Sequence, residues 1–329
     1  MHTVLVTGAS GFLGKHLVRH LLDGDPSVQV RAFSRTPFPG DGDGRVESVL
    51  GDITEPDNVA SAVAGSDEIY HLAGVVNRSP ANHWSLYRTH VDGTRNVCEA
   101  LLKHGPRRCV IATTSGTVAV SREPVVHAEA SGYKQAVVHP WPYYLSKIYQ
   151  EKQALWYCQH RKLPIVIVNP SLLLGPGDDR RSSTNDVRLF LKGQIKAVPS
   201  GGLNLIDARD AAAGMANAMR SGAVGERYLL GGENLTFKEW IAQTAHVAGV
   251  SGPRFQPAEP VARFGAATLR RIYPLVGKTF EMDDASIRMS SLFWYCDTAK
   301  AQRELGLVTR PTEATLRDTI TYLRASGAA

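Results

Sequence analysis

Thr7-Gly-Ala-Ser-Gly-Phe-Leu-Gly14 is the stretch of sequence that decides the fold. It follows the β-branched run Thr3–Thr7 and opens the segment Gly11–Leu22, whose apolar residues recur at helical spacing. Gly8 allows a tight turn off the strand, Gly11 lets the backbone approach a pyrophosphate, and Gly14 allows close helix–strand packing. The N–H groups at the start of the helix favour an anion. The stretch therefore predicts a dinucleotide-binding turn, with a purely structural turn as the alternative.

Short β-branched runs alternate with helix-like segments as far as residue 170. The expected strands are Thr3–Thr7, Val28–Phe33, Val46–Leu50, Glu68–Ala73, Arg108–Thr113 and Pro164–Asn169, and the expected helices are Gly11–Leu22, Asn58–Ala64, Trp84–Leu102 and Tyr143–Arg161. Continuous apolar runs are typical of parallel strands that are covered on both faces. Right-handed crossovers then give an α/β fold, a doubly wound parallel-sheet Rossmann domain over residues 1–170.

The pattern loosens after Pro170. Residues 175–183 are typical of a loop, and further helices and strands are expected at Val187–Lys192, Leu203–Ile206, Arg209–Met219 and Glu226–Leu230, before a mainly helical remainder. We expect 203–230 to return to the Rossmann domain. The rest of 171–329 is predicted to form a smaller, mainly helical substrate domain over the carboxyl edge of the sheet, where ligands bind in such folds.

Composition narrows the function classes. The chain has 329 residues, of which 43% are hydrophobic and 21% charged, as in soluble globular proteins. Its net charge of +6 is scattered and forms no basic stripe, so no nucleic-acid partner is expected. The four cysteines form no Cys-x-x-Cys pair, so neither a metal nor a redox site is expected. The sequence has no signal-peptide pattern and no apolar run long enough to span a membrane, so a cytoplasmic location is expected.

The second expected strand points to one of the two nicotinamide dinucleotides. NAD-binding proteins usually carry Asp or Glu about 20 residues after the glycines, to hold the ribose 2′-hydroxyl. Here the sequence is Phe33-Ser-Arg-Thr36, with Arg35 and no acid. An Arg can pair with a 2′-phosphate, which favours NADP(H) over NAD(H), although a solvated surface Arg is the alternative. After the third strand, Asp52 is either an acceptor for the adenine amino group or a turn cap.

Tyr143-Tyr-Leu-Ser-Lys147 opens a long expected helix. Residues four apart share a helix face, so Tyr143 and Lys147 lie together, and Tyr144 points about 100° away. A lysine ammonium lowers the pKa of a phenol from about 10, which suits a general acid/base. Of the 11 tyrosines, only Tyr143 has a lysine four residues later. We interpret the pair as proton-transfer groups.

A hydroxyl group at the end of the fifth expected strand is the third candidate catalytic group, beside Tyr143 and Lys147. Ala112-Thr-Thr-Ser-Gly-Thr-Val118 places Ser115 where a carbonyl oxygen would be polarised, with Thr114 and Thr117 as rivals and turn capping as the structural alternative. No Gly-x-Ser-x-Gly elbow indicates a hydrolase. His71, in the fourth strand, is interpreted as a packing or cofactor-adjacent residue.

Together these segments resemble the extended short-chain dehydrogenase/reductase superfamily over nearly the whole chain. The matching pieces are Thr7–Gly14, Gly51-Asp52, His71–Gly74, Val91–Thr94, Thr113–Ser115, Tyr143–Lys147 and Asn169–Gly177. The C-terminal segments Tyr228–Leu235 and Phe293–Asp297 are similar to dihydroflavonol-reductase-like, hydroxysteroid-dehydrogenase-like and hopanoid-associated epimerase-like members.

The resemblance implies roles for individual residues. Ser115 polarises the carbonyl, Tyr143 is the acid/base and Lys147 assists it, while Asp52 contacts adenine. The cofactor-binding residues implied are Gly8, Ser10, Gly11, Phe12, Leu13, Gly14, Arg35, Asp52, Ile53, Leu72, Ala73, Gly74, Thr113, Tyr143, Lys147, Asn169, Pro170 and Ser171. Two positions depart from the family pattern: His90 stands where Asn is common, and Asn169 where Arg commonly precedes Pro. These departures indicate a specialised substrate.

The expected function is NADP(H)-dependent reduction of a ketone or aldehyde, or oxidation of the alcohol. The expected substrate is a small molecule, and an apolar one is an option. One alternative is a nucleotide-sugar epimerase or dehydratase, whose diphosphate Arg180, Arg181 and Arg188 would bind. The other is a non-catalytic NADP sensor, against which the retained Tyr143 and Lys147 argue.

One C-terminal segment has two interpretations. Val261–Lys278 carries both apolar and basic residues, so it is either a basic amphipathic helix at a membrane surface or, as we favour, the wall or lid of an apolar pocket. The family resemblance also implies helices that pack between subunits, hence a homodimer.

Overall fold

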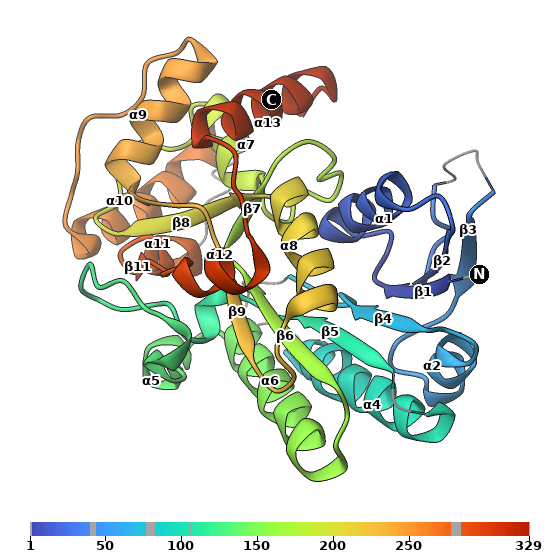
Figure 1. Cartoon of the computed structure of the whole chain (residues 1–329). Helices are drawn as coiled ribbons and strands as arrows, with labels where there is room; N and C mark the ends of the chain where they lie inside the picture. Colours follow the sequence, from blue (N-terminus) through green and yellow to red (C-terminus); the bar gives the residue numbers. More distant parts are fainter. Residues whose placement is uncertain (1, 40–43, 77–82, 106, 278–283, 329) are drawn as a thin grey trace.

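A seven-stranded sheet is the centre of the computed structural model, which describes residues 2–39, 44–76, 83–105, 107–277 and 284–328 (Figure 1). Its order is β3-β2-β1-β4-β5-β6-β9, and every neighbouring pair is parallel. The strands are β1 (His2–Thr7), β2 (Val28–Ser34), β3 (Val46–Leu50), β4 (Glu68–His71), β5 (Arg108–Ala112), β6 (Ile165–Pro170) and β9 (Arg227–Leu230). The strand order reverses between β1 and β4, which confirms the doubly wound fold.

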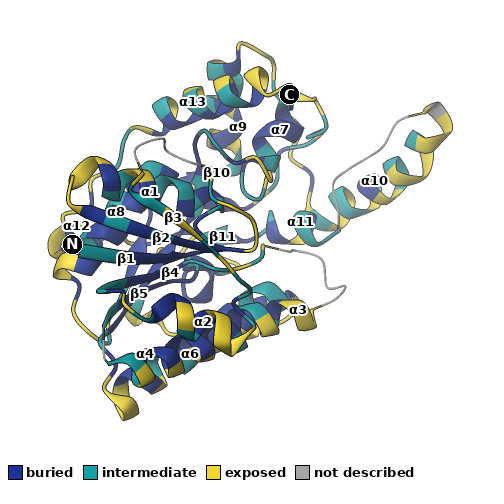
Figure 2. Cartoon of the chain, turned by 90° about the vertical axis from the view of Figure 1, so that its right-hand side faces the viewer, coloured by how far each residue is buried: buried dark blue, intermediate teal, exposed yellow. Residues whose placement is uncertain are grey.

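Helices cover both faces of this sheet (Figure 2). The helices α1 (Phe12–Gly24), α8 (Ala208–Ser221) and α12 (Ala299–Leu305) lie on one face, and α2 (Pro56–Val63), α4 (Gly93–His104) and α6 (Pro142–Arg161) on the other. Alternate strand residues point to opposite faces, so Val4 and Val6 join the core under α1, whereas Leu5 joins the core under α4. Because both faces are buried, the strands are continuously apolar, as the sequence indicates.

The long helix expected at Trp84–Leu102 contains an interruption. It consists of α3 (Trp84–Tyr87), a π-helical segment Arg88–Asp92 and α4. A π-helical segment holds an extra residue per turn and so re-aims its side chains. Here it contains His90, which is fully buried.

A second, smaller sheet lies outside the main one. It is formed by β7 (Leu172–Leu174), β8 (Gly202–Asp207), β10 (Glu233–Thr236) and β11 (Phe293–Trp294). We expected 203–230 to return to the Rossmann domain, but the strand at 203–206 belongs to the small sheet instead. Its pairing partner β7 carries the chain onward from β6, and β9 takes the place beside β6 in the main sheet. Within 203–230, α8 and β9 are the elements that lie in the main layers.

The remaining helices surround this small sheet. They are α7 (Asn185–Leu191), α9 (Phe237–Ala248), α10 (Glu259–Ile272), α11 (Asp284–Met289) and α13 (Thr312–Ala325), with the short α5 (Gln135–Val138) near α6. Buried side chains of α7, α9, α13 and β8 form a core of their own. None of the helices in the described part of the chain combines the length and apolar composition that a bilayer span requires.

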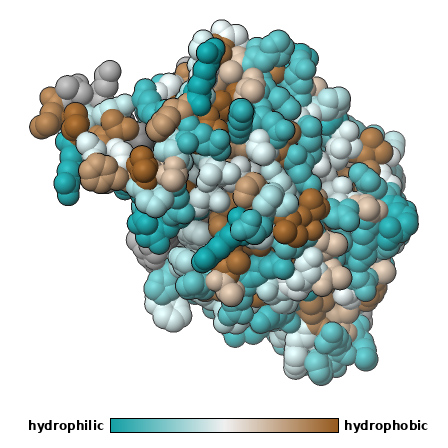
Figure 3. Space-filling view, turned by 90° about the vertical axis from the view of Figure 1, so that its left-hand side faces the viewer, coloured by the Kyte–Doolittle hydropathy of each residue, from teal (hydrophilic) through white to brown (hydrophobic). Residues whose placement is uncertain are grey.

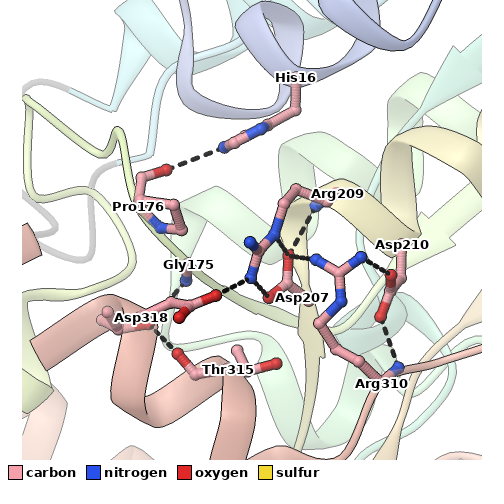
Figure 4. Close-up of polar contacts among 10 residues, drawn as sticks. His16, Gly175, Pro176, Asp207, Arg209, Asp210, Arg310, Thr315 and Asp318 are labelled. Atoms are coloured by element: carbon pink, nitrogen blue, oxygen red, sulfur yellow. Dashed lines mark hydrogen bonds and ion pairs between the residues drawn. The ribbon is translucent and has the colours of Figure 1, made fainter. Parts of the chain in front are cut away.

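A cluster of ion pairs joins the two units where β8 ends (Figure 4). Arg209 binds Asp207 at 2.7 Å and Asp318 of α13 at 2.6 Å, while Arg310 binds Asp210 at 2.9 Å. Burial would raise the pKa of Asp207, but the hydrogen bonds from Arg209 outweigh it and hold that pKa below its ordinary value. The cluster thus fixes α13 against the start of α8.

Candidate active site

One cavity of about 900 Å³ lies at the carboxyl edge of the main sheet, between the sheet and the smaller unit. Most residues that the sequence singles out line it together: Gly8, Ser10, Gly11, Phe12, Leu13, Gly14, Arg35, Leu72, Gly74, Thr113, Ser115, Tyr143, Lys147, Pro170 and Ser171. Asp52, Ile53, Ala73 and Asn169 are not part of this lining. The topology therefore gathers segments that are distant in sequence into one site.

The glycine turn has the geometry that its spacing predicts. Gly8 has φ +71°, and a Cβ there would lie 2.8 Å from the backbone nitrogen of Ala73. A Cβ on Gly14 would lie 2.7 Å from the carbonyl oxygen of Ala9. Only glycine fits at either position. Gly11 precedes α1 and has no side chain to cap the helix, so the positive end of the helix dipole faces the cavity.

Arg35 and Asp52 lie near each other beyond the ends of β2 and β3. Arg35 lines the cavity. The Asp52 carboxylate accepts hydrogen bonds from the backbone N–H and hydroxyl of Thr54, both at 2.9 Å. These bonds lower the pKa of Asp52 against the effect of burial, and the positive charge of Arg35 lowers it further. Asp52 is thus a turn cap, one of its two predicted roles, and its contact with adenine stays a prediction.

Tyr143 and Lys147 occupy the first two turns of α6, and both line the cavity. Lys147 is buried, with Nζ 2.8 Å from Oε1 of Gln150 and 3.4 Å from the carbonyl oxygen of Ala112. Burial lowers the pKa of Lys147 to about 7, and the carboxylate of Glu151 opposes this shift. Lys147 is therefore a lysine whose charge changes near neutral pH.

Aromatic rings hold Tyr143 in place. Its ring lies 5.0 Å from that of Tyr144 and 5.8 Å from that of His90, edge-on to each. Tyr144 also lines the cavity and stacks on Trp294 at 4.9 Å. The phenol of Tyr143 thus stands on a constrained ring at the cavity wall.

Ser115 begins a short 3-10 helix, Ser115–Thr117, directly after β5 and lines the cavity. Thr114 and Thr117 carry the two alternative hydroxyl groups. The hydroxyl of Thr117 donates to Glu151 at 2.7 Å, and Thr117 is not part of the cavity lining. Thr114 lines the cavity, and its hydroxyl oxygen caps the turn by accepting from the N–H of Gly116 at 3.4 Å. Ser115 is thus the hydroxyl placed best for a substrate oxygen.

His90 connects the cavity wall to the start of α6. Its Nε2 accepts from the backbone N–H of Val75 at 3.1 Å, so its Nδ1 carries the proton and donates to the Ser146 hydroxyl at 2.8 Å. Ser146 in turn donates to the carbonyl oxygen of Tyr143 at 2.7 Å. Burial holds the pKa of His90 well below its ordinary value, so the ring is neutral. His90 therefore anchors the turn that carries Tyr143.

Glu151 is a functional residue that the sequence analysis missed. It is fully buried, and its Oε1 accepts hydrogen bonds at 2.7 Å from Thr113, Thr117 and Asn169. These three partners come from the ends of β5 and β6 and from the turn that carries Ser115. The amide of Asn169 is thus directed to Glu151 and away from the cavity. The spacing Lys147-x-x-x-Glu151 would have revealed this carboxylate, because it places both side chains on one helix face.

A second buried polar chain joins Lys147 to the glycine turn. Gln150, the partner of Lys147, donates to the hydroxyl of Thr94 at 3.0 Å, and Thr94 is 2.9 Å from Nε2 of His71. The other ring nitrogen of His71 lies 2.8 Å from the hydroxyl of Thr7. His71 is fully buried and outside the cavity lining, which matches the packing role expected of it.

The far side of the cavity has an apolar wall, formed by Leu189, Ile195, Leu203, Phe237, Trp240, Ile241, Met289 and Trp294. Polar residues also line this side, among them Asp178, Asp186, Asn204 and Ser290. Arg180 and Arg181, from the loop at 175–183, also line it. Arg188 does not: it is buried on α7, and its Nε donates to Asn185 at 2.9 Å. The expected set of three arginines is therefore not assembled at the cavity.

The segment Val261–Lys278 does not form the wall or lid that we favoured. No residue of 261–277 is part of the cavity lining, and Lys278 lies outside the described residues. Ser286 and Met289 of α11 line the cavity instead. That interpretation of the segment is wrong.

Comparisons with known proteins agree with this geometry. Residues 4–231 match the model of the NAD dependent epimerase/dehydratase family. The chain is 31% identical to sterol demethylase protein B of Methylococcus capsulatus, over 99% of each chain, and 29% identical to 2-alkyl-3-oxoalkanoate reductase of Stenotrophomonas maltophilia, also over 99% of each. The crystal structure of gox2253 superposes with a TM-score of 0.85 at 26% identity, covering 100% of this chain and 99% of the other.

Proposed function

Because the chain belongs to the NAD dependent epimerase/dehydratase family, we propose that it is an NADP(H)-dependent oxidoreductase that interconverts a carbonyl and an alcohol. One observation carries the proposal: Ser115, Tyr143 and Lys147 line the same cavity as the glycine turn and Arg35. The nicotinamide dinucleotide fits there because a side chain at Gly8 or Gly14 would fill the turn. Net consumption of reduced cofactor with a panel of ketones and aldehydes tests the proposal.

The residues of the site divide the chemistry among them. The bound nicotinamide supplies the hydride. Ser115 and Tyr143 donate hydrogen bonds to the carbonyl oxygen, on which negative charge develops. Tyr143 then gives that oxygen its proton, and Lys147 stabilises the phenolate that is left. The His90–Ser146 contacts and the Glu151 network hold the two donor-bearing turns in position.

We expect NADPH to bind at least about tenfold more tightly than NADH, because Arg35 can pair with the 2′-phosphate and the end of β2 carries no acid to hold a 2′-hydroxyl. The variant Arg35→Gln should weaken NADPH binding about 10- to 100-fold and leave NADH binding little changed. Fluorescence titration of the reduced nicotinamide measures both. Arg19→Gln is the matched control, since Arg19 is 81% exposed on α1. Preference of the wild type for NADH would refute the assignment of Arg35.

The apolar far wall supports an apolar substrate. Two of the relatives are named for a sterol and for a 2-alkyl-3-oxoalkanoate, and such molecules match a cavity lined by Trp240, Ile241 and Met289. A nucleotide-sugar epimerase or dehydratase is the second candidate, favoured by the family and by Arg180 and Arg181 at the cavity. Such an enzyme returns the hydride to its substrate, so it consumes no net NADPH.

We also propose a cytoplasmic homodimer. Trp84, Tyr149 and Trp156 are exposed on α3 and α6, where a second copy would cover them. The mass of the protein in solution, measured by light scattering, tests this assembly.

A further inference from the structure

The helix α10 projects from the body of the protein as an arm (Figure 2). It packs on α11, and two contacts hold its base: Arg263 pairs with Asp284 at 2.9 Å, and Glu259 accepts from the Ser291 hydroxyl at 2.9 Å. A 3-10 helix, Tyr273–Val276, extends it. The arm therefore has one face toward the protein and the rest of its surface in solvent.

Large apolar side chains face solvent along this arm. Val261 is 57% exposed, Phe264 77%, Ile272 48% and Leu275 83%. Val261, Phe264 and Ile272 lie within about 80° of one another around the axis of α10, since each α-helical residue turns by about 100°. Leu275 lies one 3-10 turn beyond Ile272, on the same side. Figure 3 shows hydrophobic side chains gathered on the projecting arm. A soluble protein rarely exposes such a stripe without a partner.

One basic side chain borders the stripe. Arg271 is exposed and lies about 20° beyond Phe264 around the helix axis. Arg263 and Arg270 lie on the side of the helix that carries the buried Ala266, and Arg263 pairs with Asp284. An apolar stripe bordered by an arginine suits a bilayer surface, because the apolar side chains enter the acyl boundary while the guanidinium group stays among the phosphates.

We propose that α10 docks this protein on an anionic phospholipid bilayer, with the stripe of Val261, Phe264, Ile272 and Leu275 inserted and Arg271 on the headgroups. A projecting arm reaches a flat surface without obstruction from the body of the protein (Figure 2). The helix that follows, α11, packs on the arm and carries Ser286 and Met289 of the cavity lining, so the docked arm lies next to one wall of the cavity. The proposal concerns binding alone and does not rest on the proposed reaction.

Vesicle flotation tests the docking, with phosphatidylcholine vesicles that contain or lack phosphatidylglycerol. The wild type should float with the anionic vesicles, and more weakly as salt is added. The double variant Phe264→Asp, Leu275→Asp should bind them at least about 100-fold more weakly, since two large apolar side chains are lost from the interface. Arg271→Gln should weaken binding to anionic vesicles about fivefold and leave binding to neutral vesicles unchanged, whereas Arg270→Gln, on the opposite side of the helix, should change neither.

Val308→Asp is the matched control, because Val308 is 79% exposed between α12 and α13, away from the arm. It should bind vesicles like the wild type, and thermal melting should show that all variants are folded. Failure of the wild type to float, or equal loss of flotation in Val308→Asp, would overturn the proposal. A second result would also overturn the proposal. If light scattering shows that Phe264→Asp converts a dimer to a monomer, and no variant changes lipid binding, the stripe packs against a second copy of the chain.

Discussion

Replacement of Tyr143 by phenylalanine should lower kcat for carbonyl reduction about 10³-fold while NADPH still binds. The variant keeps the ring between Tyr144 and His90 and removes only the hydroxyl that protonates the substrate oxygen. Steady-state turnover together with NADPH titration separates loss of chemistry from loss of binding.

Tyr144→Phe is the control for this experiment. Tyr144 lines the same cavity but stacks on Trp294 and is assigned no proton transfer, so its variant should retain most of the turnover. Equal turnover in Tyr143→Phe and wild type would remove Tyr143 from the mechanism. A wild type that binds NADPH and turns over no carbonyl compound would favour the non-catalytic sensor.

Lys147→Met should abolish most of the activity and yet stabilise the cofactor-free protein below pH 7. Burial lowers the pKa of Lys147 from 10.5 to about 7, so the native state binds fewer protons than the unfolded state between these values. The free energy of unfolding of the wild type should therefore rise with pH in this window, by up to about 1.4 kcal/mol per pH unit. Below pH 7 the full free-energy cost of burying the Lys147 ammonium group lowers the free energy of unfolding of the wild type.

Urea unfolding of both proteins from pH 6 to pH 10 measures this effect, as a stability difference that shrinks as the pH rises. Lys152→Met is the matched control, because Lys152 is exposed on the same helix and should show no such trend. A difference between wild type and Lys147→Met that stays constant across this range would contradict a lowered pKa for Lys147.

Short sequence patterns predicted those parts of the site whose geometry is set by residues close together in the chain. The glycines at 8, 11 and 14 specify a turn by their own conformational needs, and Tyr143 and Lys147 share a face because one helix carries both. The parallel sheet followed from continuous apolar strands, which both covering layers bury. In each case the signal lay within a few residues.

Contacts between distant segments could not be predicted in this way. The strand at 203–206 has the same pattern in either sheet, and its place is set by pairing with β7, β10 and β11, which are distant in sequence. Glu151 gains its role from Thr113 and Asn169, at the ends of two other strands. The alternation of apolar and basic residues after Val261 indicated an amphipathic helix but not which way its apolar side would face.

Transfer of deuterium from NADPH labelled at the nicotinamide C4 distinguishes net reduction from epimerisation or dehydration at this site. With an apolar ketone that the enzyme accepts, we expect deuterium on the carbinol carbon of the product and an equal amount of NADP⁺ formed. A product that differs from the substrate but carries no deuterium, formed without any loss of NADPH, would contradict net reduction. That result would assign the site to an epimerase or dehydratase.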